Sequence, residues 1–595
     1  MKNTGYPSTD RLHEQGHVFW EKHPIIPGIS IYYMMRAANI VYGERTAINC
    51  LDLKLTYKKL FEISKTISKA FKEIGIKEND IIPVFMPNYA QAVAIFLAAN
   101  RIGATVSFLN PGCTDTEIKY YINLFESKLF INYDKTIEYN KEMMKGTGLK
   151  QIITLEQRDL NKSAFEPDLT HKIGNSDFIS FNELELIANQ YKYPFRTMYG
   201  KDQNALILFT SGSTGTPKSV VLTNQNVIAS GIYMKNTGRI KAKEGEKCLV
   251  CVPFGYPYGF STSALMTLLC GREAILAPNL DHTNVNDALR KNPNYIFGSP
   301  AVLEMMKRAT EEELDLSSVH SFVSGGDFLT PEEAERGIEF FKQHRADTEF
   351  YNGSGNAESV ATNTMAVGSK IKRTTVGKPL VGSTAIVIDP ETYEEKKYGE
   401  EGILCISGKH IFKEYYKEPE LTKKAKLEYE GEIYLVTGAM GFLDKEGYFT
   451  MTGRKSRFKI LSDGNKLYPE HLKQFLSKVE CVEKCAAVAK PNEDTLWESK
   501  AYVVLKPGYE KTKELEMQII EELKKMVEKS ENENTNNLLK TFEIPKSITF
   551  IDEIPLLPSD KEDYNLLENW AKEEYENEHN QKRLGGKKWK LEYIF

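Results

Sequence analysis

The sequence lacks the features that mark a membrane protein or a nucleic-acid-binding protein. Its longest apolar run, Ala92 to Ala99, is too short to span a bilayer, and the N-terminus has no basic segment followed by an apolar one. The formal net charge is only -5 over 595 residues, so no basic surface for nucleic acid or for an anionic membrane is expected. We therefore expect a cytoplasmic protein without a transmembrane segment. The sequence leaves the oligomeric state open.

The eight cysteines do not have the spacing of a complete zinc site. Cys248 and Cys251 are spaced like half of a zinc ligand set, but the next pair, Cys481 and Cys485, is spaced differently and lies far along the chain. Several cysteines lie inside apolar runs, so we expect buried, reduced thiols.

The N-terminal histidines resemble a zinc-protease motif without completing it. His13-Glu-Gln-Gly-His17 fits HExxH, and His23 stands where a third zinc ligand would follow. The extended motif needs a glycine where Trp20 stands, because the chain must turn sharply there. Only twelve residues precede His13, too few for the sheet that should flank such a helix. A metalloprotease is therefore disfavoured.

The most informative stretch is Thr210 to Lys218, which reads T-S-G-S-T-G-T-P-K after the apolar run Leu206 to Phe209. Its glycines, hydroxyl side chains and terminal lysine are typical of a loop that binds a polyphosphate. The nucleoside-triphosphatase loop GxxxxGK[ST] does not fit, because Pro217 replaces its second glycine and a strand-like run, Val220 to Leu222, follows instead of a helix. A surface loop of small polar residues remains the alternative.

The spacing of apolar residues predicts an α/β fold, because segments with the spacing of a helix alternate with segments typical of a buried strand in the first part of the chain. The expected helices are Thr56 to Ile74, Tyr89 to Ile102 and Thr116 to Ser127, the last with a hydroxyl cap, and the expected strands are Ile81 to Met86, Thr105 to Leu109 and Leu129 to Tyr133. Such βαβ units favour a mainly parallel sheet.

Glycines follow two later strand-like runs, at Phe322 to Leu329 (F-V-S-G-G-D-F-L) and at Tyr351 to Glu358 (Y-N-G-S-G-N-A-E). Loops of this kind gather at one edge of a parallel sheet, where α/β proteins bind their ligands. Towards the C-terminus the sequence predicts an amphipathic helix over Lys513 to Lys529 and a mobile polar loop over Ser530 to Asn537.

Together these stretches resemble the adenylate-forming superfamily, which includes acyl-CoA synthetases, firefly luciferase and the adenylation domains of nonribosomal peptide synthetases. Thr210 to Lys218 supplies the signature TSG[ST]TGxPK in full. The resemblance extends from about Leu55 to Asp563. Four more stretches resemble family motifs in the family order: Leu109 to Ile118, Val376 to Gly382, Thr437 to Phe449 and Pro555 to Lys561.

The resemblance implies an α/β protein of two domains. Residues 1–455 would form a large AMP-binding domain of doubly wound sheets plus a small barrel-like part. Residues 456–595 would form a smaller α+β domain that rotates on a hinge at Ser456, where the family prefers aspartate or lysine.

The reaction implied is the ATP-dependent activation of a carboxylic acid. The carboxylate attacks the α-phosphorus of ATP, an acyl-adenylate forms, pyrophosphate leaves, and a thiol, that of coenzyme A, then displaces AMP. Two alternatives stay open. A carrier-protein thiol could be the acceptor, or the chain could be a non-catalytic or repurposed homologue that binds a nucleotide or an acyl group.

The resemblance also assigns roles to residues. The loop and Lys218 would hold the β- and γ-phosphates, Glu358 would bind Mg²⁺, Arg454 the ribose, and Lys561 would bridge the substrate carboxylate and the α-phosphate. The nucleotide-binding residues would be Thr210, Ser211, Gly212, Ser213, Thr214, Gly215, Lys218, Gly355, Asn356 and Arg454. The catalytic residues would be Lys561, Glu358 and Thr214. The acid pocket would contain Tyr256, Tyr258, Gly325 and Gly326, and the paired glycines would leave room for a ring or chain.

The sequence departs from the family pattern mainly on the adenosine side. Ser354 and Ala357 replace the aromatic residue and the threonine of YGxTE, although Tyr351 is a candidate substitute for the aromatic platform. Ala439 replaces the aspartate that grips the ribose, and losing a hydrogen bond to a charged group of this kind would weaken nucleotide binding about ten- to a hundredfold.

Two further departures lie near the reacting groups. Asp560 replaces a glycine before Lys561, and Tyr256 replaces the histidine at the gate of the acid pocket. The residues that the chemistry needs are retained, so we expect an active ligase with a weakened grip on the nucleotide. The sequence does not reveal which acid is activated.

Overall fold

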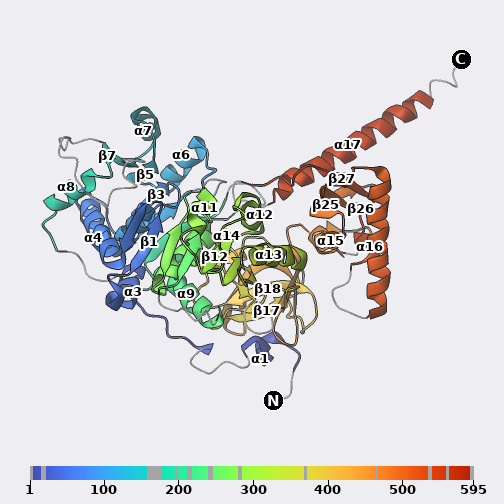
Figure 1. Ribbon diagram of the computed structural model, residues 1–595, viewed down its shortest axis with the longest axis horizontal. Coiled ribbons are helices and arrows are strands. Elements are labelled where there is room, and N and C mark those ends of the chain that lie inside the picture. Colours follow the sequence, from blue (N-terminus) through green and yellow to red (C-terminus); the bar gives the residue numbers. More distant parts are fainter. Residues whose placement is uncertain are drawn as a thin grey trace. The chain divides into compact units, whose positions relative to one another are not determined.

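The computed structural model describes residues 4–14, 22–156, 177–194, 199–210, 217–238, 245–278, 284–327, 329–366, 372–457, 459–463, 466–533, 539–557 and 562–589 (Figure 1). These residues divide into two compact units. The larger comprises Arg11–Ala385 and Cys405–Thr437, and the smaller comprises Met1–Asp10, Ile386–Leu404 and Gly438–Phe595. The predicted boundary at Ser456 stays a prediction.

The first sheet of the larger unit has eight strands among the described residues. Strands β8, β4, β3, β5, β6 and β7 run parallel, and β9 and β19 add an antiparallel edge. In spatial order the strands are β19 (Glu414–Tyr415), β9 (Ser219–Thr223), β8 (Asn204–Phe209), β4 (Thr105–Phe108), β3 (Ile81–Phe85), β5 (Leu129–Tyr133), β6 (Gln151–Leu155) and β7 (Phe178–Ser180).

The second sheet of the larger unit has nine strands in the part of the chain that is described. Its six middle strands are parallel, and the outer strands β2, β15 and β16 are antiparallel to their neighbours. The order is β16 (Lys378–Pro379), β15 (Thr364–Met365), β14 (Glu349–Ser354), β13 (Ser321–Ser324), β12 (Tyr295–Gly298), β10 (Lys247–Val250), β11 (Glu273–Leu276), β1 (Thr46–Cys50) and β2 (Leu53–Thr56).

These two sheets confirm the predicted α/β class and the predicted parallel pairing. The predicted helices and strands of the first 135 residues are all present, with bounds within a few residues of those expected. The start of α6 was misplaced, because its cap is Thr114, whose side chain forms a capping box with Glu117, and not Thr116.

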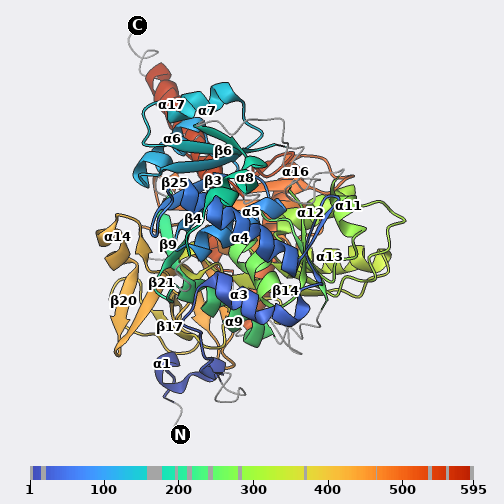
Figure 2. The same cartoon turned by 90° about the vertical axis from the view of Figure 1, so that its left-hand side faces the viewer.

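The helices of the larger unit cover and separate its sheets. Helix α5 (Ala90–Arg101) is buried on all sides because it contacts β4 of one sheet and β1 of the other (Figure 2). The others are α3 (Ile31–Ala38), α4 (Tyr57–Glu73), α6 (Asp115–Leu124), α7 (Ile137–Met144), α8 (Glu183–Gln190), α9 (Asn224–Gly238), α10 (Met266–Leu269), α11 (Asn284–Leu289), α12 (Pro300–Ala309), α13 (Pro331–Gln343) and α14 (Pro419–Lys424), with the short helices η1 (Leu12–Glu14), η2 (Ile40–Tyr42), η5 (Ala357–Ser359) and a π-helix, η4 (Tyr258–Leu265).

The remaining strands form three smaller sheets among the described residues. A five-stranded sheet has the order β17 (Thr384–Ile388), β18 (Gly402–Ser407), β21 (Glu432–Leu443) and β20 (Lys426–Tyr429), with β22 (Phe449–Arg454) paired to β21. A hairpin pairs β23 (Lys459–Ile460) with β24 (Lys466–Leu467), and a three-stranded sheet contains β25 (Val482–Asn492), β26 (Leu496–Leu505) and β27 (Ser547–Phe550).

In the smaller unit, helices cover both faces of the β25–β27 sheet. Side chains of Cys485, Ala487 and Val503 point to one face and pack with α15 (Pro469–Leu476) and α16 (Lys513–Glu533), whereas alternate residues such as Val488 and Tyr502 pack with α17 (Tyr564–Trp589). The unit also contains α1 (Pro7–Asp10) and η6 (Thr541–Glu543). Helix α16 continues to Glu533, so the first part of the predicted loop Ser530 to Asn537 is helical, and residues 534–537 lie outside the described residues.

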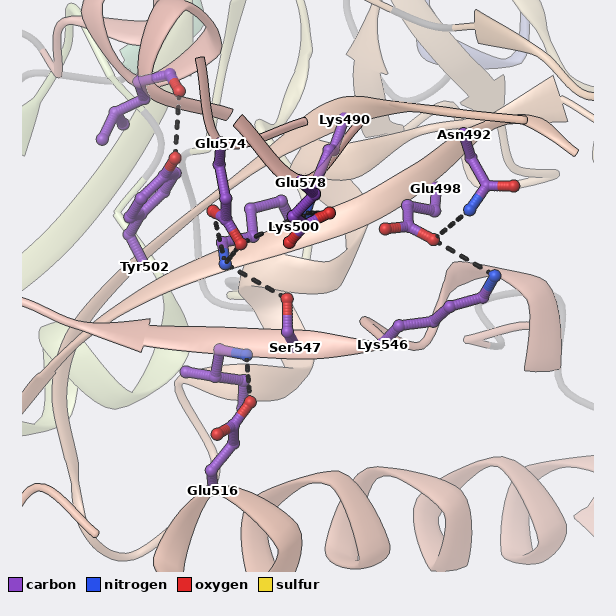
Figure 3. Close-up of polar contacts among 12 residues, drawn as sticks. Lys490, Asn492, Glu498, Lys500, Tyr502, Glu516, Lys546, Ser547, Glu574 and Glu578 are labelled. Atoms are coloured by element: carbon purple, nitrogen blue, oxygen red, sulfur yellow. Dashed lines mark hydrogen bonds and ion pairs between the residues drawn. The ribbon is translucent and has the colours of Figure 1, made fainter. Parts of the chain in front are cut away.

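The contact between α17 and the sheet contains a cluster of charges (Figure 3). Lys500 donates to Glu574 and to the Ser547 hydroxyl, and Lys490 donates to Glu574 and Glu578, all at 2.8–3.1 Å. The side chains of Lys490 and Lys500 are 4% and 2% exposed. Burial raises the pKa of Glu574 and the two lysines lower it, with a net shift below its ordinary value of 4.5. The cluster therefore holds α17 against the sheet as long as Glu574 is ionised.

The structure also describes the surroundings of the cysteines and the apolar character of the helices. Six of the eight cysteines are buried, and Cys113 and Cys270 are half-buried. Across the described residues no helix is long and apolar enough to cross a membrane.

We predict that Lys500→Met destabilises the smaller unit by about 2 kcal/mol, because Glu574 and Ser547 lose a buried partner while Lys490 still compensates part of the charge. Tryptophan fluorescence during denaturant unfolding measures this, since three of the four tryptophans, Trp497, Trp570 and Trp589, belong to this unit. Lys511→Met is the matched control, because its pair with Asp552 is exposed, and should cost less than about 0.5 kcal/mol.

The sign of the pH dependence provides a second check on this prediction. Because the folded pKa of Glu574 is depressed, its contribution is complete above its ordinary pKa and is lost as the pH falls through the folded value. The difference between wild type and Lys500→Met should therefore shrink in acid. A difference that grows in acid would contradict the assigned role of Glu574.

Candidate active site

The carboxyl ends of neighbouring parallel strands bring the predicted residues of the larger unit to one edge of the nine-stranded sheet. Strand β10 leads to Tyr256 and Tyr258, β13 to Gly325 and Gly326, and β14 to Gly355 and the residues after it. Ser324 at the end of β13 lies in register with Gly298 of β12 and with Asn352 of β14. The glycine-rich loops therefore share one edge, as the sequence pattern predicted.

The predicted phosphate loop follows the carboxyl end of β8 in the eight-stranded sheet, and the chain returns directly in β9. Its two ends are joined, because the Thr210 N–H donates to the Lys218 carbonyl at 3.1 Å and the Lys218 N–H donates to the Thr210 hydroxyl oxygen at 3.3 Å. The antiparallel pair Phe209 and Ser219 adjoins this closure. Ser211, Gly212, Ser213, Thr214 and Gly215 lie outside the described residues, so their predicted role stays a prediction.

Glu358 lies in a strained turn after β14. Two and three residues after Glu358, Val360 and Ala361 have φ of 53° and 76°, a conformation that residues other than glycine rarely adopt. A Cβ at Gly355 would lie 1.8 Å from the Ala361 carbonyl oxygen, so the chain can close this tightly only with glycine there. Asn356 closes the turn by accepting from the Ala361 N–H through its carbonyl and from the Ser359 hydroxyl through its side chain. Glu358 is thus held in a fixed place.

Tyr415 connects this turn to the other sheet. Its hydroxyl donates to Glu358 Oε1 at 2.5 Å, and the Phe412 N–H donates to the Glu358 carbonyl at 2.7 Å. The Lys218 ammonium lies 5.0 Å from the centre of the Tyr415 ring. Burial and the Glu358 carboxylate raise the pKa of Tyr415 well above its ordinary value, so the phenol is a neutral donor. Nothing in the sequence pattern singled out Tyr415.

The residues assigned to the acid pocket pack closely together. The Tyr258 hydroxyl donates to the Val323 carbonyl at 2.6 Å, and a Cβ at Gly325 would lie 2.9 Å from the Tyr258 ring. The ring therefore fills space beside Gly325 that the paired glycines were expected to leave for the acid. Tyr256 is half-buried on the loop that precedes Tyr258.

Two asparagines that sequence reasoning missed organise the same region. Asn88, after β3, accepts from the Phe254 N–H and donates to the Val252 carbonyl, both at 2.9 Å, and so fixes the loop that carries Tyr256. Asn110, after β4, adjoins Gly255, where a Cβ would lie 2.8 Å from the Asn110 side chain. Their position after parallel strands, at the same edge as Thr210, is the only signal that could have identified them.

Several buried polar atoms at these strand ends have no hydrogen-bond partner within the described part of the chain. They include Asn110 Oδ1, Ser324 Oγ and Asn363 Oδ1. Leaving such atoms unpaired costs free energy, and a bound ligand or water would relieve that cost. The edge therefore has the polar groups of a binding site.

Tyr351 does not replace the missing aromatic residue at this edge. Its hydroxyl donates to Glu349, at the opposite end of β14. The ring thus points back along the strand, away from Gly355.

The remaining predicted residues belong to the smaller unit or lie outside the described residues. Ala439 of β21 lies directly opposite Arg454 of β22 in an antiparallel pair. Ser456 is exposed in the turn after β22, where the Arg457 N–H donates to the Arg454 carbonyl at 2.9 Å. Lys561 is outside the described residues, although Glu562 beside it pairs with Lys473 at 2.6 Å.

Comparison with known proteins agrees with this architecture. The model of the AMP-binding enzyme family matches residues 36–416, and that of the AMP-binding enzyme C-terminal domain matches residues 472–561. A long-chain-fatty-acid–CoA ligase of Bacillus subtilis is 26% identical over 568 residues, which cover 93% of this chain and 96% of the relative.

Solved structures share the fold. ATP-bound MatB from Rhodopseudomonas palustris superimposes with a TM-score of 0.76 at 21% identity, over 92% of this chain and 100% of that one. The anthranilate CoA ligase AuaEII in complex with anthranoyl-AMP gives a TM-score of 0.77 at 18% identity, over 91% and 97% of the two chains. The chain therefore belongs to the AMP-binding enzyme family, the adenylate-forming superfamily of acyl-CoA synthetase-like acid–thiol ligases.

Proposed function

We propose that the protein activates a carboxylic acid with ATP, releases pyrophosphate and transfers the acyl group to the thiol of coenzyme A. The observation that carries this proposal is the meeting of Lys218, Glu358 and Tyr415 beside the closed base of the phosphate loop. A cation and a carboxylate held beside a polyphosphate loop suit the phosphate end of ATP. Family membership and the ligase relative support the same reaction.

The retained residues would share the work of the first step. Lys218 and the loop would bind the β- and γ-phosphates and stabilise the charge of the leaving pyrophosphate. Lys561 would hold the substrate carboxylate against the α-phosphate, so that attack is in line and AMP is joined to the acid as pyrophosphate departs.

Glu358 fits the role of a magnesium ligand. Among the described residues no group of three or more His, Cys, Asp or Glu side chains could hold a metal alone, so a cation here would share Glu358 with phosphate oxygens. Mg²⁺ prefers this combination and supplies charge neutralisation when bound. Tyr415 donates to Glu358 Oε1, and the Glu358 carboxylate would hold the cation together with the phosphates.

The acid and the acceptor are proposed only by class. The Tyr258 ring beside Gly325 favours a short or flat acid over a bulky one. The relatives named as CoA ligases favour coenzyme A over a carrier-protein thiol. The losses at Ser354, Ala357 and Ala439 favour the alternative of a non-catalytic homologue.

ATP–pyrophosphate exchange against a panel of short, long and aromatic acids tests the proposal. We expect exchange with at least one acid, and about a hundredfold loss in Lys561→Ala because the carboxylate and α-phosphate lose their shared cation. Lys417→Ala, which removes an exposed lysine paired with Glu126, is the control and should keep full activity. Failure with every acid would exclude the ligase. Full activity in Lys561→Ala would exclude the assigned mechanism.

Ala439→Asp should restore a ribose-binding carboxylate beside Arg454. We expect ATP to bind about tenfold more tightly, because a hydrogen bond to a charged group is regained. Calorimetric titration with ATP measures the change, and Ala439→Asn separates the effect of the charge from that of the side-chain size. Unchanged affinity in the aspartate variant would show that the ribose does not lie there.

The proposed hinge at Ser456 is tested by Ser456→Pro. Proline fixes φ and removes an N–H, so thioester formation should slow at least about tenfold while adenylation is preserved. Rapid-quench measurement of both half-reactions, with Ser456→Ala as the control, reports this. Thioester formation as fast as in wild type would disprove the hinge.

A further inference from the structure

Tyr415 touches two of the groups that the proposed nucleotide site needs. Its hydroxyl donates to the Glu358 carboxylate at 2.5 Å, and the Lys218 ammonium lies over its ring, 5.0 Å from the ring centre. Tyr415 and Glu358 are 5% and 7% exposed, so the hydrogen bond between them is shielded from bulk water, and Lys218 is half-buried. A cation over an aromatic face is attracted to the ring.

The backbone fixes the place of the ring. Tyr415 pairs with Val220 where β19 meets β9, and the flanking Tyr416 N–H donates to the Ser219 carbonyl at 2.8 Å. Lys218 immediately precedes β9, so the strand that carries Tyr415 is held in register with the end of the phosphate loop. The Phe412 ring packs against Tyr415 with centres 4.8 Å apart, which limits the rotation of the ring.

The two opposite charges each contact Tyr415 and do not pair with one another. Lys218 and Glu358 are both described, and both contact Tyr415, yet no ion pair joins them. A direct ion pair would occupy the ammonium and the carboxylate with one another. Because each charge contacts Tyr415 and not the other charge, each stays available to a ligand of the opposite sign.

We propose that Tyr415 is a positioning residue that orients Glu358 for a divalent cation through its hydroxyl and Lys218 for the phosphates through its ring face. This inference rests on the proposed function, because it assumes that the ligand is Mg²⁺-bound ATP. The hydroxyl and the ring have separable tasks, which two substitutions distinguish.

Tyr415→Phe removes the hydroxyl and keeps the ring. We expect the affinity for ATP with Mg²⁺, measured by calorimetric titration, to fall about tenfold, while the affinity for ATP in the presence of a chelator changes less than about threefold. Tyr415→Leu removes both contacts and should weaken ATP binding in both conditions. The melting temperature of each variant shows whether the fold is preserved.

Tyr416→Phe is the matched control. Tyr416 is the next residue of the chain, and its ring packs against Phe125, away from Glu358. This variant should bind ATP like the wild type, with and without Mg²⁺. Equal losses in Tyr415→Phe and Tyr416→Phe would reveal a merely structural effect and would overturn the inference.

The failures of the inference and of the proposed function are distinguishable. If the wild type binds ATP with Mg²⁺ more tightly than ATP alone and Tyr415→Phe keeps that difference, the inference is wrong and the proposed function stands. If the wild type shows the difference, Tyr415→Phe loses it, and no acid supports pyrophosphate exchange, the positioning role is upheld and the ligase is excluded. If the wild type binds no ATP, both are wrong.

Discussion

The hydrogen bond from Tyr415 to Glu358 joins the two sheets of the larger unit at the place where their functional loops meet. Glu358 follows β14 of the nine-stranded sheet, and Tyr415 belongs to the edge strand of the eight-stranded sheet. A strained turn at Val360 and Ala361 holds the carboxylate, and the pairing of β19 with β9 holds the phenol. Because both partners of this hydrogen bond are fixed by backbone, the position of the Glu358 carboxylate follows from the fold.

The antiparallel return of β9 explains how the two ends of the predicted phosphate loop are joined. A loop that opens into a helix offers the helix N-terminus to phosphate, whereas this loop closes on itself through Thr210 and Lys218. Pro217 is compatible with that closure because the chain continues as a strand. Lys218 immediately precedes β9 and therefore lies close to β19. Strand β9 pairs with the edge strand β19, which contains Tyr415. This pairing brings Tyr415, which is distant in sequence, close to the end of the loop.

Local features of the fold were predictable from the sequence, whereas contacts between sheets were not. Thr56 caps α4, and the strand Leu129 to Tyr133 has the bounds that its apolar run predicted, because periodicity and capping act over a few residues. The helix expected from Thr116 with a hydroxyl cap begins at Asp115, because Thr114 caps it through a capping box with Glu117. Residues 530–533 extend α16 although their composition favours a loop.

At the candidate site the predictable part was the set of strand-end loops, since parallel strands place their carboxyl ends together. Tyr415 donates a hydrogen bond to a residue that lies 57 positions earlier in the chain, and Asn88 bonds to two residues that lie 164 and 166 positions later. In both cases the partner follows a strand of the other sheet, so no local sequence pattern could have predicted the contact. The room expected beside Gly325 was misjudged for the same reason, because it is filled by the ring of Tyr258 from another loop.

We propose that the phosphate half of the nucleotide site is intact, whereas the adenosine half departs from the family pattern at Ser354, Ala357 and Ala439. Calorimetric comparison of ATP, AMP and magnesium pyrophosphate on the wild-type protein tests it most directly. We expect ATP and magnesium pyrophosphate to bind with affinities within about tenfold of each other, and AMP to bind about a hundredfold more weakly than ATP. AMP binding as tight as that of ATP, together with no binding of pyrophosphate, would contradict it.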